Sequence, residues 1–372
     1  MKNRKKILFL LHIPPPIHGS SVIGQYLKDS DLLKQHFDCD HLNLLASKKV
    51  SGTSKVSLNK IIGFVIIWFR LLLKLLKNKP DLCYLAITSR GVAFFRDVLL
   101  IFLLKCFGVK RVYHMHNKGV SQCQQNYIYD RCYRFVFKDA RVILLSRLLY
   151  ADVKKYISEK DLYICPNGIK RITGLAKEFT EKPFNKVPKI LFLSNLIKSK
   201  GVFVLLEACK LLKDRSISFY CSFVGAEGDI SESRFEQKIN ELSLTKQVKY
   251  LGKRYANEKH IEFLNADIFV FPTYYQKECF PLVLLESLQN NLPVISTYEG
   301  GIPDLIDNGK SGFLVPQKEV LALSKKIEIL LKNPLLRQKM GNEGRKKFDK
   351  EFTLQKFEQN MLHILQEITE KC

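Results

Sequence analysis

Short runs of β-branched and aromatic residues alternate with longer helical segments along this chain of 372 residues. The predicted strands are 7–12, 39–45, 81–85, 111–115, 142–145, 162–165, 189–193, 218–224, 248–251, 268–271 and 294–296. Helical periodicity fills most of the intervals between them, for example in 58–77, 92–107 and 126–137. This alternation favours parallel sheets that are covered by helices on both faces. We therefore predict an α/β protein made of doubly wound, Rossmann-like domains.

The alternation is interrupted near residues 170–188, where glycine and proline occur without a sustained period. This stretch is predicted to link an N-terminal domain over 1–178 to a C-terminal domain over 186–350. A helix in 351–372 is expected to pack back towards the first domain. Ligands of doubly wound sheets bind beyond the carboxyl ends of the strands, so we expect the site in a cleft between two facing domains.

The formal net charge of +24 is concentrated in the first half of the chain. Residues 1–180 hold 31 Lys and Arg against 12 Asp and Glu, a net charge of +19, whereas residues 181–372 hold 29 against 24, a net charge of +5. Such asymmetry indicates that the first half meets an anionic partner. Nucleic acid, a phospholipid surface and a phosphorylated substrate all fit this requirement.

Cysteine spacing and hydropathy predict a cytoplasmic protein. The ten cysteines include no C-x-x-C pair, so free thiols in a reducing compartment are expected. The apolar run 7–11 is too short for a secretory signal. The most hydrophobic segment, 61–76, has the length of a helix rather than of a membrane span, and Arg70 and Lys74 interrupt it.

The segment 271–315 carries the strongest indication of function. Glu278 and Glu286 are eight residues apart, the first in the loop after a predicted strand and the second about two turns into the helix that follows. The residues at the start of that helix are Cys279, Phe280, Pro281 and Leu282. Free backbone amides at a helix start favour anionic or hydroxyl-rich ligands. The two carboxylates are able to accept hydrogen bonds from two parts of one ligand, such as a ribose and a hexose.

The residues that follow this pair extend the pattern. After ECFPLVLLE, which spans 278–286, come NLPVIS, GGIPDLI and SGFLV. The paired glycines allow a ligand to approach the backbone closely. The whole block resembles the donor-binding module of retaining glycosyltransferases of family 4, whose E-x7-E motif corresponds to Glu278 and Glu286. The resemblance implies the GT-B fold and a nucleoside diphosphate sugar as donor.

The resemblance continues in LSNLIKSKG at 193–201, where the family usually has a basic pair that binds the diphosphate. Lys200 matches the lysine of that pair. Asn195 stands where many members have arginine, so it offers only a neutral hydrogen bond. The resemblance therefore implies donor binding by Asn195 and Lys200 at the diphosphate, by Glu286 at the ribose and by the 279–282 backbone at the sugar.

In the first domain, PPPIHGSSV follows the first strand, and Gly19 opens the next helix as the family's glycine loop does. That loop approaches donor or acceptor in the family, so the resemblance implies that Gly19 is among the donor-binding residues. VYHMHNKGV at 112–120 places His116 just past a strand, where it matches the family's active-site histidine near the transferred sugar. His114 is a rival for that position, because residues two apart on a strand point the same way. The resemblance implies a catalytic centre that contains His116 and Glu278.

The sequence does not match two other nucleotide-binding motifs. The stretch NGKSG has Asp304 where a P-loop needs its leading glycine, and no G-x-G-x-x-G occurs. We therefore expect no cofactor beyond the nucleotide-sugar co-substrate, and metal dependence is not implied. A nucleic-acid partner is not expected either, because a basic–aromatic recognition motif is lacking.

Together, the residues and the resemblance predict retaining transfer of a sugar from a nucleoside diphosphate sugar to a hydroxyl of a glycan or lipid-linked acceptor. Capsule, O-antigen or exopolysaccharide synthesis is the expected setting. The segment 60–79 is either a core helix or an amphipathic helix lying on anionic lipid, which would make the protein peripheral at the inner face of the cell membrane. Two alternatives stay open: a GT-B-like sugar-nucleotide epimerase, which needs no acceptor, and a catalytically silent membrane-associated scaffold.

Overall fold

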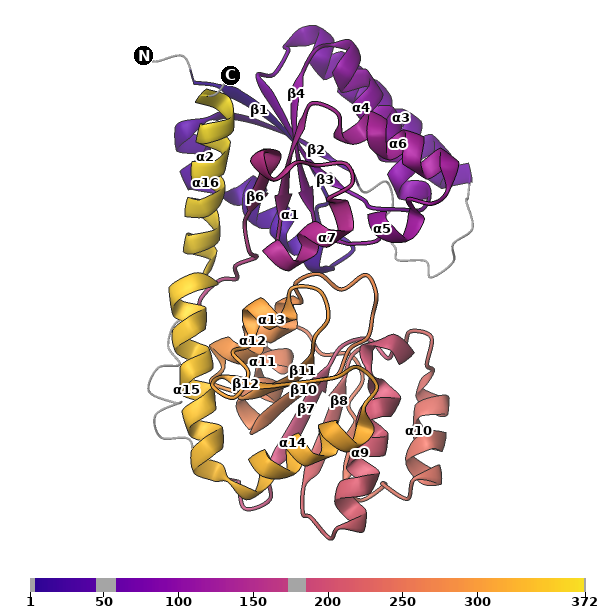
Figure 1. The fold of residues 1–372 in the computed structure, drawn as a ribbon, viewed down its shortest axis with the longest axis vertical. Helices are drawn as coiled ribbons and strands as arrows, with labels where there is room; N and C mark the ends of the chain where they lie inside the picture. The colour runs from indigo at the N-terminus through magenta and orange to yellow at the C-terminus, as the bar shows by residue number, and fades with distance from the viewer. Residues whose placement is uncertain (1–3, 45–57, 173–184, 371–372) are drawn as a thin grey trace. The chain divides into compact units, whose positions relative to one another are not determined.

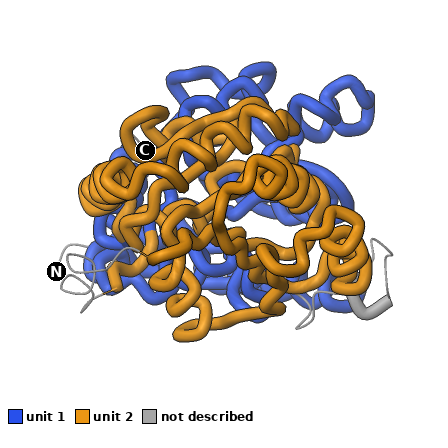
Figure 2. The backbone as a smooth tube through the Cα atoms, turned by 90° about the horizontal axis from the view of Figure 1, so that it is seen from below, with its two compact units in different colours: residues 1–168, 354–372 blue, residues 169–353 orange. Residues whose placement is uncertain are grey.

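The computed structural model describes most of the chain, namely residues 4–44, 58–172 and 185–370. The chain divides into two compact units (Figure 2). Unit 1 comprises Met1–Gly168 and Leu354–Cys372, and unit 2 comprises Ile169–Thr353. Most of the predicted linker 170–188 lies outside the described residues.

Unit 1 is built on a six-stranded parallel sheet with the strand order β2-β1-β3-β4-β5-β6 (Figure 1). Its strands are β1 (Lys6–Leu11), β2 (Asp38–Asn43), β3 (Leu82–Ile87), β4 (Lys110–Met115), β5 (Ala140–Leu144) and β6 (Leu162–Ile164). Its helices are α1 (Gly19–Asp29), α2 (Asp31–His36), α3 (Leu58–Lys77), α4 (Val92–Cys106), α5 (Val120–Cys123), α6 (Tyr127–Phe137), α7 (Tyr150–Val153) and α16 (Leu354–Glu370). The strand order reverses at β1, which pairs with β2 on one side and with β3 on the other.

Unit 2 repeats the plan with the strand order β12-β11-β10-β7-β8-β9. Its strands are β7 (Lys189–Leu193), β8 (Tyr220–Val224), β9 (Val248–Tyr250), β10 (Ile268–Phe271), β11 (Val294–Thr297) and β12 (Gly312–Val315). Its helices are α9 (Val202–Asp214), α10 (Glu232–Glu241), α11 (Ala256–Asn265), α12 (Leu282–Gln289), α13 (Ile302–Leu305), α14 (Val320–Lys332) and α15 (Pro334–Glu351). Here the order reverses at β7, between β8 and β10.

The two sheets confirm the predicted α/β fold of doubly wound parallel sheets. Every residue of β3, β10, β11 and β12 is buried, as expected for parallel strands that helices cover on both faces. Strand β12 was not among the predicted strands. It is short and begins with Gly312, and a Cβ at this glycine would meet the Val294 carbonyl oxygen at 2.0 Å. A glycine that a neighbouring strand requires weakens the strand signal in the sequence.

The last helix, α16, packs against α2 of unit 1 (Figure 1). Phe357, Met361 and Leu365 recur at helical spacing on its buried face and are almost fully excluded from solvent. The Tyr163 hydroxyl at the end of the sheet donates to the Glu367 carboxylate at 3.2 Å. The chain therefore enters unit 2 once and returns to complete unit 1.

In unit 2 the loops after β7 and β10 touch at the point where the strand order reverses. The Tyr274 amide donates to the Ser199 carbonyl oxygen at 2.8 Å. Gly201 has a φ of +89°, and a Cβ there would meet the Pro272 carbonyl oxygen at 2.2 Å. Only glycine satisfies both the left-handed backbone and this close approach. Ligands of doubly wound sheets bind at such reversals.

We predict that Gly201→Ala destabilises the chain more than Gly252→Ala does. Gly252 also has a left-handed φ, +66°, but nothing lies within 4 Å of a Cβ built there. Its substitution is expected to cost about 1–2 kcal/mol of unfolding free energy through backbone strain alone. The clash at Gly201 adds at least about 2 kcal/mol to that. Urea unfolding followed by circular dichroism measures both losses, and equal losses would contradict the contact between the two loops.

Candidate functional site

Lys200 and Glu278 meet at the carboxyl edge of the unit 2 sheet, where the strand order reverses. Lys200 ends the 3-10 turn Lys198–Lys200 after β7, and Glu278 lies in the loop between β10 and α12. Their side chains form an ion pair and are only 15% and 11% exposed. The Lys200 ammonium also lies over the Tyr275 ring, 4.5 Å from its centroid. Desolvation offsets much of the Coulomb gain of such a pair, so stability alone does not explain it.

Glu286 is held by a lysine that the sequence analysis did not single out. Lys259 of α11 donates from Nζ to Glu286 Oε1 at 2.6 Å. The other carboxylate oxygen, Oε2, is buried and has no hydrogen-bond donor among the described residues. A buried acceptor left in this state costs free energy that a ligand hydroxyl would recover. Glu286 is the fifth residue of α12, so it lies just past the first turn rather than two turns into the helix as predicted.

Of the four residues predicted at the start of the helix, Cys279 and Phe280 lie in the loop before α12. Pro281 is the N-cap and Leu282 the first helical residue, and no side chain of the described residues caps this end of the helix. Cys279 and Phe280 are buried, and the Phe280 ring lies 5.8 Å from that of Phe352. The side chains of Cys279 and Phe280 therefore hold the loop in place. An uncapped helix start carries partial positive charge that favours an anionic or hydroxylated ligand.

The glycine pair after β11 packs against the loop that carries Glu278. The Gly301 amide donates to the Cys279 carbonyl oxygen at 2.6 Å. A Cβ at Gly300 would meet the Glu278 carbonyl oxygen at 2.4 Å. The close approach that requires glycine here is therefore made by the chain itself, whereas the sequence analysis expected a ligand. The pair fixes the backbone beneath Glu278.

Asn195 is exposed in the loop after β7 and links this loop to the next one. Its Oδ1 accepts a hydrogen bond from the Ala226 amide at 3.3 Å. Gly225 lies below, where a Cβ would meet the Ser194 carbonyl oxygen at 1.9 Å. Asn195 therefore positions two loops at the carboxyl edge of the sheet and adds no charge there.

In unit 1, His116 is the first residue beyond β4, as predicted. The rival His114 is fully buried, and its Nδ1 shares a 2.5 Å hydrogen bond with the Tyr84 hydroxyl. The two imidazole centroids lie 4.2 Å apart. His116 is partly exposed, and its Nδ1 has no hydrogen-bond partner within the described part of the chain. His114 Nε2 also has no partner there, but its burial keeps it from a ligand, so His116 is the better ligand-facing residue.

Two histidines that the sequence analysis missed lie near His116 at the carboxyl edge of unit 1. His12 follows β1 directly, and its Nδ1 shares a 3.0 Å hydrogen bond with the Ser20 hydroxyl. His18 is the N-cap of α1, which begins at Gly19 as predicted. The His12 and His18 ring centroids are 6.0 Å apart. His12 directly follows a strand and His18 directly precedes a helix, and these positions could have identified them from the sequence.

Burial keeps this group of imidazoles neutral. It lowers the pKa of His116 to about 3, and the neighbouring His18 adds to that shift. Burial, then His116, lowers the pKa of His114 well below its usual value. The pKa of His12 is also well below its usual value, through burial, Arg96 and the adjacent histidines. Burial lowers the pKa of His18 as well. Neutral imidazoles are suited to hydrogen bonds with uncharged hydroxyl groups.

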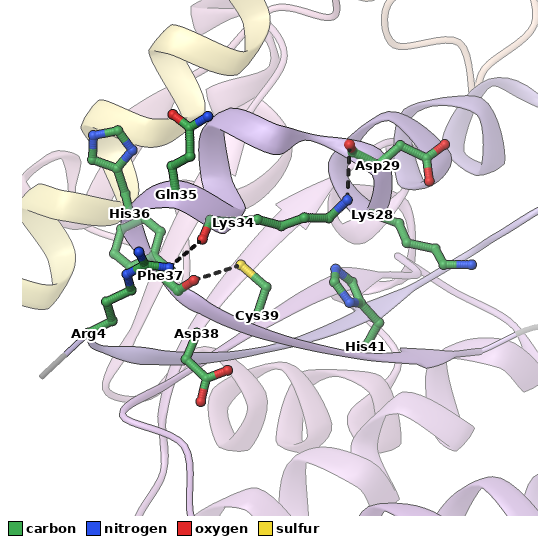
Figure 3. A pocket seen from close by; sticks show the side chains of 10 residues that line it. All are labelled: Arg4, Lys28, Asp29, Lys34, Gln35, His36, Phe37, Asp38, Cys39 and His41. Atoms are coloured by element: carbon green, nitrogen blue, oxygen red, sulfur yellow. Dashed lines mark hydrogen bonds between the residues drawn. The ribbon is translucent and has the colours of Figure 1, made fainter.

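A groove of about 1090 Å³ on unit 1 contains none of these residues (Figure 3). Its lining residues come from the N-terminus, α1, α2 and β2, and they are Arg4, Lys28, Asp29, Lys34, Gln35, His36, Phe37, Asp38, Cys39 and His41. Several of its polar groups bond to each other or to nearby backbone, such as the Lys34 ammonium to the Asp29 carbonyl oxygen at 3.2 Å. The groove therefore lies apart from the predicted site residues.

The region that holds Lys200, Glu278 and Glu286 matches a known protein family. Residues 176–347 match the family described as "Glycosyl transferases group 1". The match covers slightly less than half of the chain, and the site residues predicted for the second half of the chain all fall within it.

Curated bacterial proteins align with part of the chain. "Putative colanic acid biosynthesis glycosyltransferase WcaL" of Escherichia coli K12 is 30% identical over 143 residues, which are 37% of this chain and 35% of that protein. "Capsular polysaccharide biosynthesis glycosyltransferase CapM" of Staphylococcus aureus is 28% identical over 167 residues, 44% of this chain and 42% of that protein. The aligned parts span less than half the length of these relatives.

Solved structures share the fold of the whole chain. HepE of Anabaena, solved in complex with UDP and glucose, superposes with a TM-score of 0.70 over 98% of this chain and 100% of that chain. The sequences are 18% identical, so the likeness concerns the fold. The two-unit α/β fold of the chain is the predicted GT-B fold.

A metal-binding cluster and a membrane-spanning helix are both lacking among the described residues. Within the ranges 4–44, 58–172 and 185–370, no group of three or more His, Cys, Asp and Glu side chains is placed to hold a metal ion. None of the helices in those ranges is long and apolar enough to cross a membrane.

We predict that the free energy of unfolding falls when the pH is lowered from 7 to 5. His12, His18, His114 and His116 stay neutral in the folded chain because folding lowers their pKa values. The unfolded chain binds more protons in this range, so stability is lost as the pH falls through the unfolded value of about 6.5. Each histidine contributes up to about 1.4 kcal/mol per pH unit below that value.

Urea unfolding at pH 7 and pH 5 measures this loss. Burial lowers the pKa of His41 as well, so five histidines take part. The double variant His12→Asn with His116→Asn removes two of the five, so its stability is expected to fall less over the same interval. An identical acid sensitivity in the variant would show that the loss arises elsewhere.

Proposed function

We propose that this protein is a retaining glycosyltransferase that moves a sugar from a nucleoside diphosphate sugar to a hydroxyl of a glycan or lipid-linked oligosaccharide. The observation that carries the proposal is that both carboxylates of ECFPLVLLE are paired with lysines in one unit, Glu278 with Lys200 and Glu286 with Lys259. The group 1 domain and the polysaccharide-synthesis relatives support it.

In this proposal the group 1 domain binds the donor through its nucleoside. Glu286 Oε2, buried and without a donor among the described residues, accepts hydrogen bonds from the ribose hydroxyls. Lys259 holds the other oxygen and thereby fixes the orientation of the carboxylate. The complex of HepE with UDP and glucose supports this ligand class, since that protein shares the fold.

Lys200 binds the diphosphate when the donor enters. A diphosphate is a stronger partner for the ammonium than one carboxylate, because several phosphate oxygens accept charge-assisted hydrogen bonds. Exchange of partners releases Glu278, which then accepts hydrogen bonds from the sugar hydroxyls. The uncapped start of α12, with the backbone of Cys279–Leu282, orients the sugar. Stabilising the departing diphosphate is the main electrostatic demand of the reaction.

Unit 1 binds the acceptor, with His116 and Gly19 at the carboxyl edge of its sheet. The acceptor hydroxyl forms its bond to the anomeric carbon on the face that the diphosphate leaves, as the bond from that carbon to the diphosphate oxygen breaks. The hydroxyl proton passes to the departing diphosphate, and the configuration is retained. The low pKa of His116 suits an imidazole that orients hydroxyl groups without adding charge. No metal is required in this scheme, because Lys200 supplies positive charge at the diphosphate.

The setting we propose is capsule, O-antigen or exopolysaccharide synthesis, with the protein peripheral at the inner face of the cell membrane. The names of WcaL and CapM refer to colanic acid and capsular polysaccharide biosynthesis, which supports the first part. The concentration of positive charge in the first half of the chain supports an anionic lipid surface as partner.

We predict that Glu286→Ala lowers kcat/KM for transfer by about ten- to a hundredfold, the equivalent of hydrogen bonds to a charged group worth about 1.5–3 kcal/mol. Thermal unfolding checks that the variant remains folded. The matched control is Glu258→Ala, whose carboxylate is 63% exposed on α11 next to Lys259. Transfer from a panel of nucleoside diphosphate sugars, with product analysis, is the assay. An unchanged rate would refute the role of Glu286, and donor conversion without acceptor would identify an epimerase instead.

A second prediction distinguishes binding of the diphosphate from binding of the nucleoside. Lys200→Met is expected to weaken nucleoside diphosphate binding by about tenfold or more, because it removes a charge-assisted hydrogen bond, while nucleoside binding stays unchanged. Lys198→Met, an exposed neighbour on the same turn, serves as control. Isothermal titration calorimetry measures both ligands. Equal weakening of the two ligands would mean that Lys200 supports the fold of the pocket rather than the diphosphate.

A further inference from the structure

Helix α3 exposes a continuous row of apolar side chains. Phe69 and Leu73 are 54% and 64% exposed. The full row follows helical spacing and consists of Ile62, Val65, Ile66, Phe69, Leu73 and Leu76. A helix that is apolar on its outer side as well as its inner side is ordinarily buried on both. The outer side of α3 therefore has no covering element among the described residues of this chain.

The opposite side of α3 already contributes to the core of unit 1. Ile67, Leu71 and Leu75 are buried at intervals of one turn, and the helix contacts β2 and α4. Beside it, α4 exposes Leu99 and Phe102, so the apolar surface extends over two neighbouring helices (Figure 1). We call these eight exposed residues of α3 and α4 the apolar face. Exposed patches of this kind mark interaction surfaces.

The charged residues of α3 itself are all cations. The helix carries four Lys and Arg and no Asp or Glu, and one of the four, Lys74, is paired with Asp40 of β2. Arg70 and Lys77 are exposed on α3 itself. The one carboxylate of α4, Asp97, is fully buried and paired with Arg96. An apolar surface bordered by exposed cations fits a partner that is apolar inside and anionic at its surface.

We propose that the apolar face docks on the surface of an anionic lipid bilayer. The apolar side chains enter the boundary between headgroups and acyl chains, while Arg70 and Lys77 remain with the anionic headgroups. Because no helix in the described ranges is long and apolar enough to cross a membrane, α3 lies along the surface. This docking rests on the membrane association in the proposed setting and names the surface that makes it. None of its residues belongs to the donor or acceptor site, so loss of vesicle binding and loss of transfer are separate outcomes.

A second copy of the chain fits the apolar face less well. A symmetric contact brings the same residues of two copies together, so Arg70 and Lys77 of each copy would face cations of the other. Each copy also carries a net charge of +24. Like charges at an apolar contact oppose association, whereas anionic lipid neutralises them.

The test is co-sedimentation of the full chain with vesicles of phosphatidylcholine, with and without phosphatidylglycerol. The chain is expected to bind the phosphatidylglycerol vesicles and to be released by added salt. Phe69→Glu with Leu73→Glu is expected to lower vesicle binding by at least about tenfold. The matched control is Leu321→Glu with Leu335→Glu on unit 2, where these side chains are 50% and 70% exposed. It should bind vesicles as the unaltered chain does.

A second variant tests the charges. Arg70→Gln with Lys77→Gln should bind phosphatidylglycerol vesicles more weakly and with a smaller dependence on salt. Circular dichroism checks that each variant is folded, and light scattering reports its oligomeric state. The proposal is overturned if the unaltered chain does not bind anionic vesicles, or if the Phe69 and Leu73 variant binds them as well as the control. It is also overturned if that variant only converts a dimer to a monomer.

Discussion

The ion pair between Lys200 and Glu278 joins residues that are 78 positions apart. It exists because β7 and β10 are neighbours in one parallel sheet, and parallel strands deliver all their following loops to the same edge. Gly201 lets these two loops touch. The pair is nearly dry, so its attraction is strong while its net contribution to stability is small. Such a pair is readily exchanged for a charged ligand, which is the property that binding of a diphosphate requires.

Unit 1 has the same kind of parallel sheet, but the imidazoles at its carboxyl edge are uncharged. Its carboxyl edge gathers His12, His18 and His116 around a reversal of strand order at β1, and burial keeps the imidazoles uncharged. One unit thus presents lysines and carboxylates, and the other presents neutral hydrogen-bonding groups. This division suits a reaction in which an anionic donor and an uncharged acceptor hydroxyl are bound by different units of the chain.

The outer helices of unit 1 add a surface that has no part in either edge. The apolar face and its flanking cations lie on α3 and α4, two neighbouring helices of the layer that covers the sheet (Figure 1). A lipid-linked acceptor needs an enzyme that stays close to a membrane without being embedded in it. Surface docking through one layer of unit 1 leaves the carboxyl edges free for substrate.

The sequence by itself determined the architecture and half of the site. The alternation of strands and helices predicted the sheets except for β12, and the bounds of α3, β7 and β10 follow directly from the pattern of apolar residues. The motifs predicted Lys200, Glu278 and Glu286, because each motif is local: LSNLIKSKG contains the lysine and ECFPLVLLE contains both glutamates. Only the tertiary structure decided that Lys259 pairs with Glu286, that His12 and His18 lie near His116, and that one side of α3 stays exposed. A single lysine or histidine forms no periodic pattern in the sequence. A row of apolar residues does not reveal which side of a helix other elements cover. Contacts between segments that are distant in the sequence decide both.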